Sequence, residues 1–496
     1  MDLAGESIAA GHGIFLILAL GLALAFEFVN GFHDTANAVA TVIYTHTLRP
    51  TVAVVWSGCW NLVGVLTSSG AIAFSIVALL PIDLVLNAGS AAGFAMVFAL
   101  LISAIIWNLG TWYLGLPASS SHTLVGAILG VGLGHSLLTP GLGFGEGVNW
   151  SKAAEVGTSL LISPIVGFSA AGLLLLVSKK LLRRPELFRA PEPGKAPPGW
   201  IRGTLVLTCT GVSVAHGSND GQKGMGLVVL ILVGILPGAY SVNLNSSHAD
   251  LRNLATSAQL ASSVVARHAP ASPMASTEAT AELSRFLKAS GQMSDRTVPA
   301  LSIKNREIIE IVAGRGSFRE LSLANRKALR SDLYLIDATF AKLDGLDYFS
   351  NPGEREVISS YRASLGTAIH FIPSWVKFAV AVALGVGTMI GWKRIVVTVG
   401  EKIGKGHLTY AQGAAAELVA MTTIGASDYL GLPVSTTHVL SSGVAGTMAA
   451  NHSGLQVETL RNLLLAWVLT LPVCVVLGAS TFAAALYVVL NVMGLR

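Results

Sequence analysis

The longest stretch without a charged side chain is the strongest constraint on how this chain folds. No Asp, Glu, Lys or Arg occurs between Leu84 and Gly145, a run of 62 residues. One helix that crosses a bilayer needs about 20 apolar residues, so this run holds more than one crossing or a hairpin. Only 12% of the 496 residues are charged, against about 25% in soluble domains. The sequence therefore predicts an all-α, polytopic membrane protein surrounded by lipid.

Charge and polarity divide the chain into parts. A linker at 179–202 carries seven Lys or Arg and two Glu, an excess that usually marks a cytoplasmic segment. Because the basic residues lie mostly in loops, they predict topology and not a nucleic-acid surface. We expect a first transmembrane repeat at 1–178 and a second at 203–242 and 368–496, which a polar insertion at 243–367 splits.

The polar insertion shows the spacing of amphipathic helices. Apolar residues recur at i, i+3 and i+4 in one place and at i, i+4 and i+7 in another, as on one helix face. We interpret the insertion as a helical connecting element outside the bilayer, with no part in transport chemistry. A basic loop at 393–405 suggests the cytoplasm and so places the insertion outside, but long loops follow that rule poorly and its side stays open. The two apolar sets are Ile308, Ile311 and Val312, and Leu329, Leu333 and Ile336.

Two pairs of polar motifs indicate an internal repeat. Leu-Gly-Leu-Pro-Ala-Ser-Ser-Ser-His at 114–122 returns 316 residues later as Leu-Gly-Leu-Pro-Val-Ser-Thr-Thr-His at 430–438. An acidic motif at 31–38 has a counterpart 186 residues later, at 216–224. The two spacings differ by about the length of the insertion, so both halves keep one order. With the acidic N-terminus outside and the linker inside, the halves form an inverted repeat of broken helices and re-entrant hairpins, which suits alternating access.

The hydroxyl triplets of the two Pro-Ser/Thr motifs predict an anion site. Pro suits the start of a helix, and Ser or Thr suits its N-cap. A helix N-terminus presents free N–H groups and a partial positive charge, both of which attract anions. Two facing N-termini with hydroxyl donors would suit a tetrahedral oxyanion, although each triplet could instead only cap its helix. The six candidates are Ser119, Ser120, Ser121, Ser435, Thr436 and Thr437.

The acidic motifs predict the site of cation or proton coupling. Asp34 and Asn37 are three residues apart and share a helix face, and Asp220 and Lys223 repeat this spacing. An ionisable side chain within a membrane is costly and usually marks an ion or proton pathway. Glycines around both motifs, among them Gly217, permit an unwound turn. We therefore take Asp34 and Asp220 as the groups that bind a cation or proton.

The functional roles of the other polar residues in the apolar segments are less clearly indicated by the sequence. His122 and His438 follow the triplets at matched positions. They could donate to the anion, carry the coupling proton, or hold the hairpin by a backbone hydrogen bond, and we favour the last role. Glu27, Glu417 and Asp428 have no partner in the other half and are weaker candidates.

These four motifs resemble those of the inorganic phosphate transporter (Pit) family. The family signature, of the form Gly-Ala-Asn-Asp-Val-Ala-Asn-Ala, appears here as Gly-Phe-His-Asp-Thr-Ala-Asn-Ala at 31–38 and, less clearly, as Gly-Ser-Asn-Asp-Gly-Gln-Lys-Gly at 217–224. The Pro-Ala-Ser-Ser-Ser-His and Pro-Val-Ser-Thr-Thr-His elements match as well. The resemblance covers essentially all of the membrane part, and the insertion is similar to that of the bacterial, low-affinity branch.

The resemblance implies a secondary transporter, not an enzyme, that imports inorganic phosphate across the bacterial inner membrane. For the bacterial branch it implies symport of protons with a neutral complex of phosphate and a divalent metal (Mg²⁺, Ca²⁺, Mn²⁺, Zn²⁺ or Co²⁺), whereas some members use sodium. No permanently bound cofactor is expected, and a homo-oligomer stays open. The implied ligands of phosphate and cation are Asp34, Asn37, Asp220, Ser119 to Ser121 and Ser435 to Thr437, with Asp34 and Asp220 on the metal.

Two other classes of function, a hydrolase and a sulfate carrier, can be compared with a phosphate transporter on the residues alone. An intramembrane aspartyl protease also needs two buried carboxylates, but needs them side by side and leaves Lys223 and the hydroxyl triplets without a role. Neither the GxSxG nor the HExxH motif of other hydrolases occurs. A sulfate carrier would need nearly the same site as a phosphate carrier, and only the family resemblance separates the two.

One residue departs from the family pattern, and it yields a prediction. Where symmetry with Asn37 calls for a second Asn, the chain has Lys223. Its fixed ammonium could take the place of a sodium ion or contact phosphate directly as a point charge. We expect Lys223→Asn to make phosphate uptake into proteoliposomes dependent on sodium. Uptake by the variant that stays proton-driven and indifferent to sodium would contradict this role of Lys223.

Overall fold

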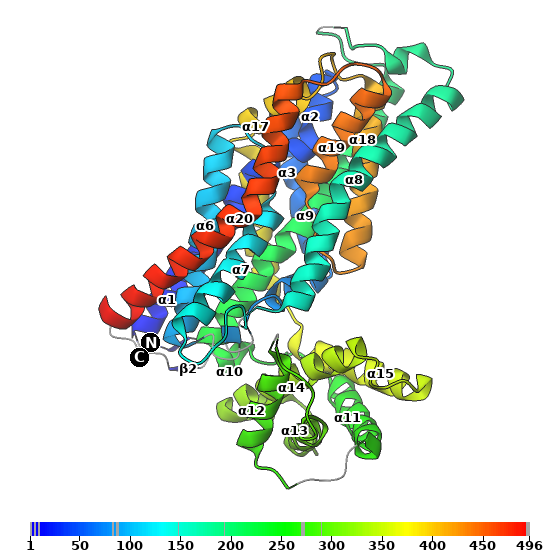
Figure 1. Ribbon diagram of the computed structural model, residues 1–496. Helices are drawn as coiled ribbons and strands as arrows, with labels where there is room; N and C mark the ends of the chain where they lie inside the picture. The colour runs from blue at the N-terminus through cyan, green and yellow to red at the C-terminus, as the bar shows by residue number, and fades with distance from the viewer. Residues whose placement is uncertain are drawn as a thin grey trace.

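The computed structural model describes residues 2–3, 6–7, 10–81, 84–85, 89–146, 148–192, 194–268, 273–288 and 290–492. The described chain is almost entirely helical, apart from a short antiparallel pair near the N-terminus, β1 (Asp2–Leu3) and β2 (Glu6–Ser7). A long helical bundle forms the body, and a smaller helical lobe lies at one end of it (Figure 1). The predicted all-α membrane class is confirmed.

The bundle consists of two sets of helices in the same order. Each set begins with a long helix, followed by a second helix that breaks and continues as a short one. Two further helices are joined by a short segment that contains the Pro-Ser/Thr motif, and a long helix ends the set. We call these joining segments the tips: the first tip is 114–119 and the second is 430–435. The first set is α1 (Ala10–Asp34) with α2 (Ala36–Tyr44), α3 (Pro50–Thr67), α4 (Ala71–Val77), α6 (Ala91–Tyr113), α7 (Ser120–Leu138) and α8 (Trp150–Leu181). The second is α9 (Gly199–Ile235), α16 (Ser374–Met389), α17 (Lys393–Val397) with the π-turn η3 (Thr398–Lys402), α18 (Tyr410–Tyr429), α19 (Thr436–Ala450) and α20 (Val457–Tyr487) with η4 (Val488–Val492).

The length and composition of the helices fit a membrane. Among the described residues, six helices are long and apolar enough to cross a bilayer. A seventh crossing is counted if α15 (Pro352–Ile369) and α16, which are bent by 75° relative to each other, form one span. Aliphatic side chains such as Leu161 and Val468 lie 70% exposed on the outside of the bundle. Such a surface would be insoluble in water and is expected of a protein in contact with lipid.

The bundle has two distinct ends. The linker end holds the linker with its 3₁₀ turn η1 (Pro185–Phe188), which contacts α18, and the basic segment 393–405. The insertion end holds α4, α10 (Pro237–Tyr240) and the lobe, where Phe74 stacks on His370 at 4.4 Å. Both basic segments therefore lie at one end and the insertion at the other (Figure 1). Which of the two ends faces the cytoplasm stays a prediction from the basic residues.

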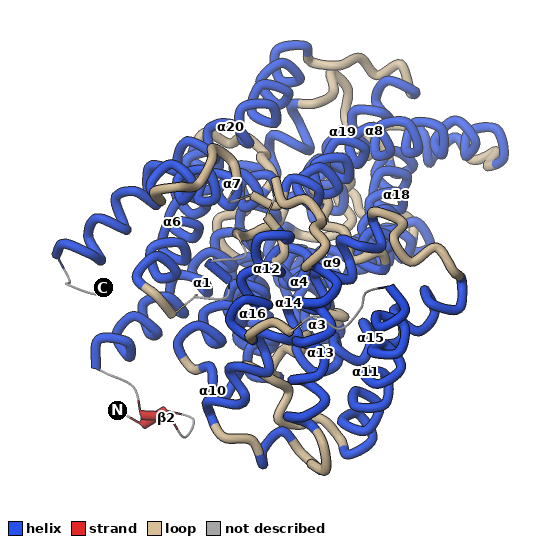
Figure 2. The backbone as a smooth tube through the Cα atoms, turned by 60° about the horizontal axis from the view of Figure 1, so that its bottom comes forward, coloured by secondary structure: helices blue, strands red, loops and turns tan. Residues whose placement is uncertain are grey.

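The insertion folds around a core of its own. It comprises α11 (His248–His268), α12 (Ser276–Leu287), α13 (Thr297–Val312), η2 (Phe318–Glu320), α14 (Leu323–Gly345) and α15 (Pro352–Ile369). Ile308 of α13 and Leu329, Leu333 and Ile336 of α14 are buried in that core, as their spacing predicts. Seen from this end, the lobe lies in front of α3, α9 and α16 (Figure 2).

The two sets of helices are interlocked. The tip-forming helix α7 packs along α20 of the other set, and α19 packs along α8. Gly130 of α7 and Gly446 of α19 are 316 residues apart, so they are equivalent in the repeat. A Cβ atom at Gly130 would lie 2.2 Å from the Val475 carbonyl oxygen, and one at Gly446 would lie 2.0 Å from that of Phe168. Small residues at these crossings let the backbones touch, as in other membrane helix pairs.

The two acidic motifs differ in the continuity of their helices. The first acidic motif does interrupt its helix, since α1 ends at Asp34 and α2 begins at Ala36. The second lies inside the unbroken helix α9, although its glycines permit an unwound turn. A Cβ atom at Gly217 would lie 2.1 Å from the Asn61 carbonyl oxygen, and one at Gly224 would lie 2.3 Å from the Glu27 carboxylate. These glycines therefore allow close packing and do not unwind the helix.

Replacing the crossing glycine Gly130 should destabilise the bundle. In Gly130→Ala the new methyl group would meet the backbone of α20, and such overpacking costs about 1–3 kcal/mol. Gly157→Ala is the matched control, because a Cβ atom there meets nothing within 4 Å. We expect a lower thermal unfolding midpoint in detergent for Gly130→Ala only. Equal midpoints for both variants would contradict the close contact of α7 and α20.

Candidate functional site

The two Pro-Ser/Thr tips start the helices α7 and α19 in the middle of the bundle. Ser119 is the N-cap of α7, where its Oγ accepts a hydrogen bond of 3.2 Å from the N–H of His122. Ser435 caps α19 in the same way, with a bond of 3.1 Å from the N–H of His438. These two hydroxyls therefore shape the tips, as Ser at an N-cap does elsewhere.

The tips also contact each other. Ser121 Oγ donates a hydrogen bond of 2.8 Å to the carbonyl oxygen of Val434, which joins the first tip to the second. The rings of His122 and His438 lie 4.6 Å apart, and His438 stacks on Trp467 at 4.1 Å. Within the described part of the chain, His122 Nδ1 and His438 Nε2 are buried without a hydrogen-bond partner, so these two nitrogens do not hold the hairpins by a backbone hydrogen bond.

The remaining hydroxyls face the acidic motifs. Ser120 Oγ lies 3.2 Å from Asp34 Oδ2 and 3.1 Å from Asp220 Oδ2, between the two carboxylates. Thr437 Oγ1 donates a hydrogen bond of 2.5 Å to Asp34 Oδ1. Asn37 Nδ2 lies 3.2 Å from the Oγ1 atoms of both Thr436 and Thr437. Each tip therefore contacts the acidic motif of the other half, and Ser120 contacts both motifs.

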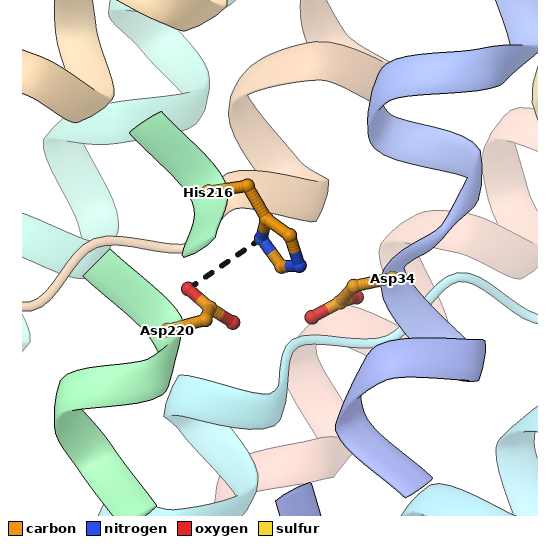
Figure 3. A group of neighbouring side chains, drawn as sticks. All are labelled: Asp34, His216 and Asp220. Atoms are coloured by element: carbon orange, nitrogen blue, oxygen red, sulfur yellow. Dashed lines mark ion pairs between the residues drawn. The ribbon is translucent and has the colours of Figure 1, made fainter. Parts of the chain in front are cut away.

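The second acidic motif supplies a cation and an imidazole. Lys223 Nζ lies 2.8 Å from Asp220 Oδ1, an ion pair whose angles do not make a hydrogen bond. His216, one turn before Asp220 on α9, has its Nδ1 at 3.8 Å from the same oxygen. In Figure 3 the carboxylates of Asp34 and Asp220 point toward each other, with the imidazole of His216 beside them. One ligand atom from each of these three residues lies within 4.8 Å of the others, a spacing that could hold a metal ion.

The site is closed from solvent and contains unpaired polar atoms. Asp34 and Asp220 are at most 1% exposed, and Lys223 is completely buried. Within the described residues, Lys223 Nζ, Asn37 Oδ1 and both ring nitrogens of His216 make no hydrogen bond. Buried polar groups in proteins are nearly always paired, so a cluster of unpaired ones fits a ligand that binds among them.

The sequence interpretation missed His216 and His33. His33 Nδ1 lies 3.3 Å from Asp34 Oδ1, and its Nε2 lies 3.1 Å from Thr111 Oγ1 on α6. The spacing of His216, four residues before Asp220, was a usable signal, because i and i+4 share a helix face. Nothing local to the sequence places the ring of His33 against α6.

The three unmatched acids lie outside this cluster. Glu417 accepts hydrogen bonds from the hydroxyls of Thr41 on α2 and Thr208 on α9. Asp428 accepts a bond of 2.6 Å from Ser218 Oγ. Glu27 packs against Gly224 and forms no hydrogen bond with the described residues. The carboxyl groups of Glu417 and Asp428 are therefore satisfied by local donors, whereas both oxygens of Glu27 are buried without a hydrogen-bond partner among the described residues.

A bundle of two interlocked repeats around a closed polar site is the architecture of a multi-pass membrane transporter. Comparison with known families identifies which one. The model of the phosphate transporter family matches residues 30–478 of this chain. The chain belongs to that family, and it is a transporter, not an enzyme.

Individual relatives agree with the family match. The low-affinity inorganic phosphate transporter PitB of Escherichia coli (strain K12) is 42% identical over 96% of this chain and 98% of its own length. PitA of the same strain is 41% identical over 95% of this chain and 96% of its own. A solved structure described as the sodium-dependent phosphate transporter has the same fold, with a TM-score of 0.51 at 20% identity over 95% of this chain and 98% of that one. The chain is thus a multi-pass bacterial membrane protein.

The position of Ser120 between two carboxylates makes it the most informative hydroxyl to remove. A hydrogen bond to a charged group contributes about 1.5–3 kcal/mol, so Ser120→Ala should slow transport of the labelled substrate about tenfold or more. Ser136→Ala is the matched control, a buried serine near the other end of α7 that bonds to the carbonyl of Leu133. Initial rates in proteoliposomes measure the effect, and a wild-type rate for Ser120→Ala would contradict a role for this hydroxyl in the site.

Proposed function

We propose that this protein imports inorganic phosphate as a neutral complex with a divalent metal, together with a proton, by alternating access. Membership of the phosphate transporter family supports phosphate as the cargo. The observation that carries the finer proposal is the pair of facing aspartates, Asp34 and Asp220, joined by Ser120 and flanked by Lys223.

The charges of the site favour a metal–phosphate complex over phosphate alone. When ionised, Asp34, Asp220 and Lys223 together carry one net negative charge. A doubly charged phosphate would add to it and be repelled in a medium of low dielectric constant. A divalent cation between the carboxylates and the phosphate makes the cargo neutral, which also lowers the cost of removing it from water. Asp34, Asp220 and His216 would hold the metal, whereas Lys223 and the hydroxyls would hold phosphate oxygens.

The contacts of Ser120 support a proton on this site. A serine hydroxyl has one hydrogen to donate, so it cannot donate to two ionised carboxylates at once. If one carboxyl is protonated, it donates to Ser120 Oγ while Ser120 donates to the other, and both contacts become hydrogen bonds. Asp220 pairs with Lys223, so Asp34 is the group that would carry the proton, on the Oδ2 that faces Ser120. Its unprotonated Oδ1 would then be the atom that contacts the metal. This proton also cancels the remaining negative charge of the site.

The arrangement of the tips supports alternating access. Both tips end at the buried site, and the first starts from the linker end whereas the second starts from the insertion end. Withdrawal of one tip would open the site to one side while the other tip keeps it closed. Inverted repeats in other transporters move in this way around a central site.

Uptake of labelled phosphate into proteoliposomes tests the proposal. We expect uptake to require an inward proton gradient, to increase with Mg²⁺, and to be indifferent to Na⁺. An inside-negative potential of about 100 mV should raise accumulation up to about fiftyfold, because one positive charge enters with each neutral complex. Asp34→Asn should abolish proton-driven uptake, whereas Asp344→Asn in the exposed part of α14 should leave it unchanged.

The conditions separate the parts of the proposal. Uptake that a sodium gradient drives without a proton gradient would overturn proton coupling. Uptake of phosphate that Mg²⁺ and chelators leave unchanged would overturn the metal–phosphate cargo. Transport of labelled sulfate in place of phosphate, under the same gradients, would overturn phosphate as the substrate.

A further inference from the structure

We propose that this protein has a second anion site, for a phosphoryl group, at the linker end of the first tip. A cavity of about 600 Å³ lies there between α6 and the segment 391–402 of the second half. Its lining includes three cations, Lys393, Arg394 and Lys402, and no acidic residue. The transport site lies deeper, and none of its residues lines this cavity.

The cations of the cavity have no acidic partners. Within the described residues, none of the three forms an ion pair with a carboxylate. The guanidinium of Arg394 lies over the rings of Trp112 at 5.2 Å and Tyr113 at 4.9 Å, which fixes its position by cation–π contact. An arginine held in this way presents its N–H groups for the planar recognition of phosphate oxygens. Lys393 and Lys402 add two positive charges that form no ion pair with the described residues.

The equivalent position in the other half bonds to its tip without a lysine-arginine pair. Thr398 Oγ1 donates 2.8 Å to the carbonyl of Gly115 in the first tip, and Ser75 Oγ donates 2.8 Å to that of Gly431 in the second. When the two hydroxyls are matched, Gly70 and Ala71 stand where the first cavity has its Lys-Arg pair. Both halves therefore have a hydroxyl that bonds to the tip, whereas the positive charge is found only at the linker end.

The walls of the cavity favour a phosphoryl group at a membrane surface. Trp392 and Trp112 lie beside the cations, and aromatic rings of this kind gather at the headgroup level of bilayers. Tyr113 and Leu114 are 65% and 69% exposed and would face lipid. Basic pockets in such positions bind the headgroups of anionic lipids. Free phosphate that leaves the transport site on this side has the same chemistry, so the two sources need separate tests.

Occupancy of this site would act on the first tip. Arg394 Nη1 donates 2.7 Å to the carbonyl of Tyr113, and Trp112 Nε1 donates 2.7 Å to that of Gly391. Together with the bond from Thr398, these contacts join the segment 391–402 to the start of the tip. An anion that bridges Lys393, Arg394 and Lys402 would tighten this segment against the tip and favour the conformation closed at the linker end.

Thermal unfolding of the purified protein in nonionic detergent tests the site without measuring transport. The variant is Lys393→Gln with Lys402→Gln, two exposed residues whose loss should not impair folding. Lys405→Gln is the control, a basic residue of the same loop that lies outside the cavity and packs on Gly454. The probes are short-chain phosphatidylglycerol, short-chain phosphatidylcholine and inorganic phosphate.

We expect phosphatidylglycerol to raise the unfolding midpoint of the wild type and of Lys405→Gln. In the double variant, the apparent affinity for phosphatidylglycerol should be weaker by about tenfold or more. A difference seen with inorganic phosphate and not with phosphatidylglycerol would assign the site to free phosphate. If neither anion distinguishes the double variant from the wild type, or if phosphatidylcholine acts equally, the site does not exist. Binding should also slow amide hydrogen exchange at 114–119 relative to 430–435, and unchanged exchange would overturn its action on the tip.

Discussion

An ionised carboxylate in the middle of a helical bundle must be compensated by protein groups, because neither lipid nor bulk water is there to do so. This protein places two of them, Asp34 and Asp220, in contact with one hydroxyl. Asp220 has the ammonium of Lys223 beside it, whereas Asp34 has the hydroxyl of Thr437 and the ring of His33. The donors come from four elements far apart in the chain, so the fold must bring them to one point.

The two tips place hydrogen-bond donors at that point. A continuous helix across the membrane would use every central N–H group in its own hydrogen bonds and leave none for a ligand. The breaks after Pro117 and Pro433 start new helices at mid-depth and supply N-termini, caps and hydroxyls there. Because α7 lies against α20 and α19 against α8, each tip is supported by the other half of the molecule. A single repeat would therefore lack both the site and the support for its own tip.

Much of this arrangement could be predicted from the sequence, since its signals are local or repeated. The matched motifs predicted the order of the two halves, and the spacing of Ile308 and Leu329 predicted the helices of the insertion. The serines that follow the two prolines predicted the helix N-caps. The partners of the hydroxyls were beyond reach, because they depend on how helices separated by hundreds of residues cross. Gly217 illustrates the limit: a glycine that permits unwinding and one that permits close packing look the same in a sequence.

The two halves differ most in the charge of their acidic motifs. This difference affects how transport of the cargo is coupled to transport of an ion. Asn37 turns toward the hydroxyls of Thr436 and Thr437 in the opposite tip, whereas Lys223 turns toward Asp220 on its own helix. A sodium ion in that place would enter and leave with the cargo. The ammonium of Lys223 cannot leave, so it supplies the same positive charge when the site is loaded and when it is empty. In the proposed cycle the proton on Asp34 therefore enters with the cargo and is released with it, and the empty site returns with one net negative charge, so that one proton is the only coupling ion that each phosphate needs.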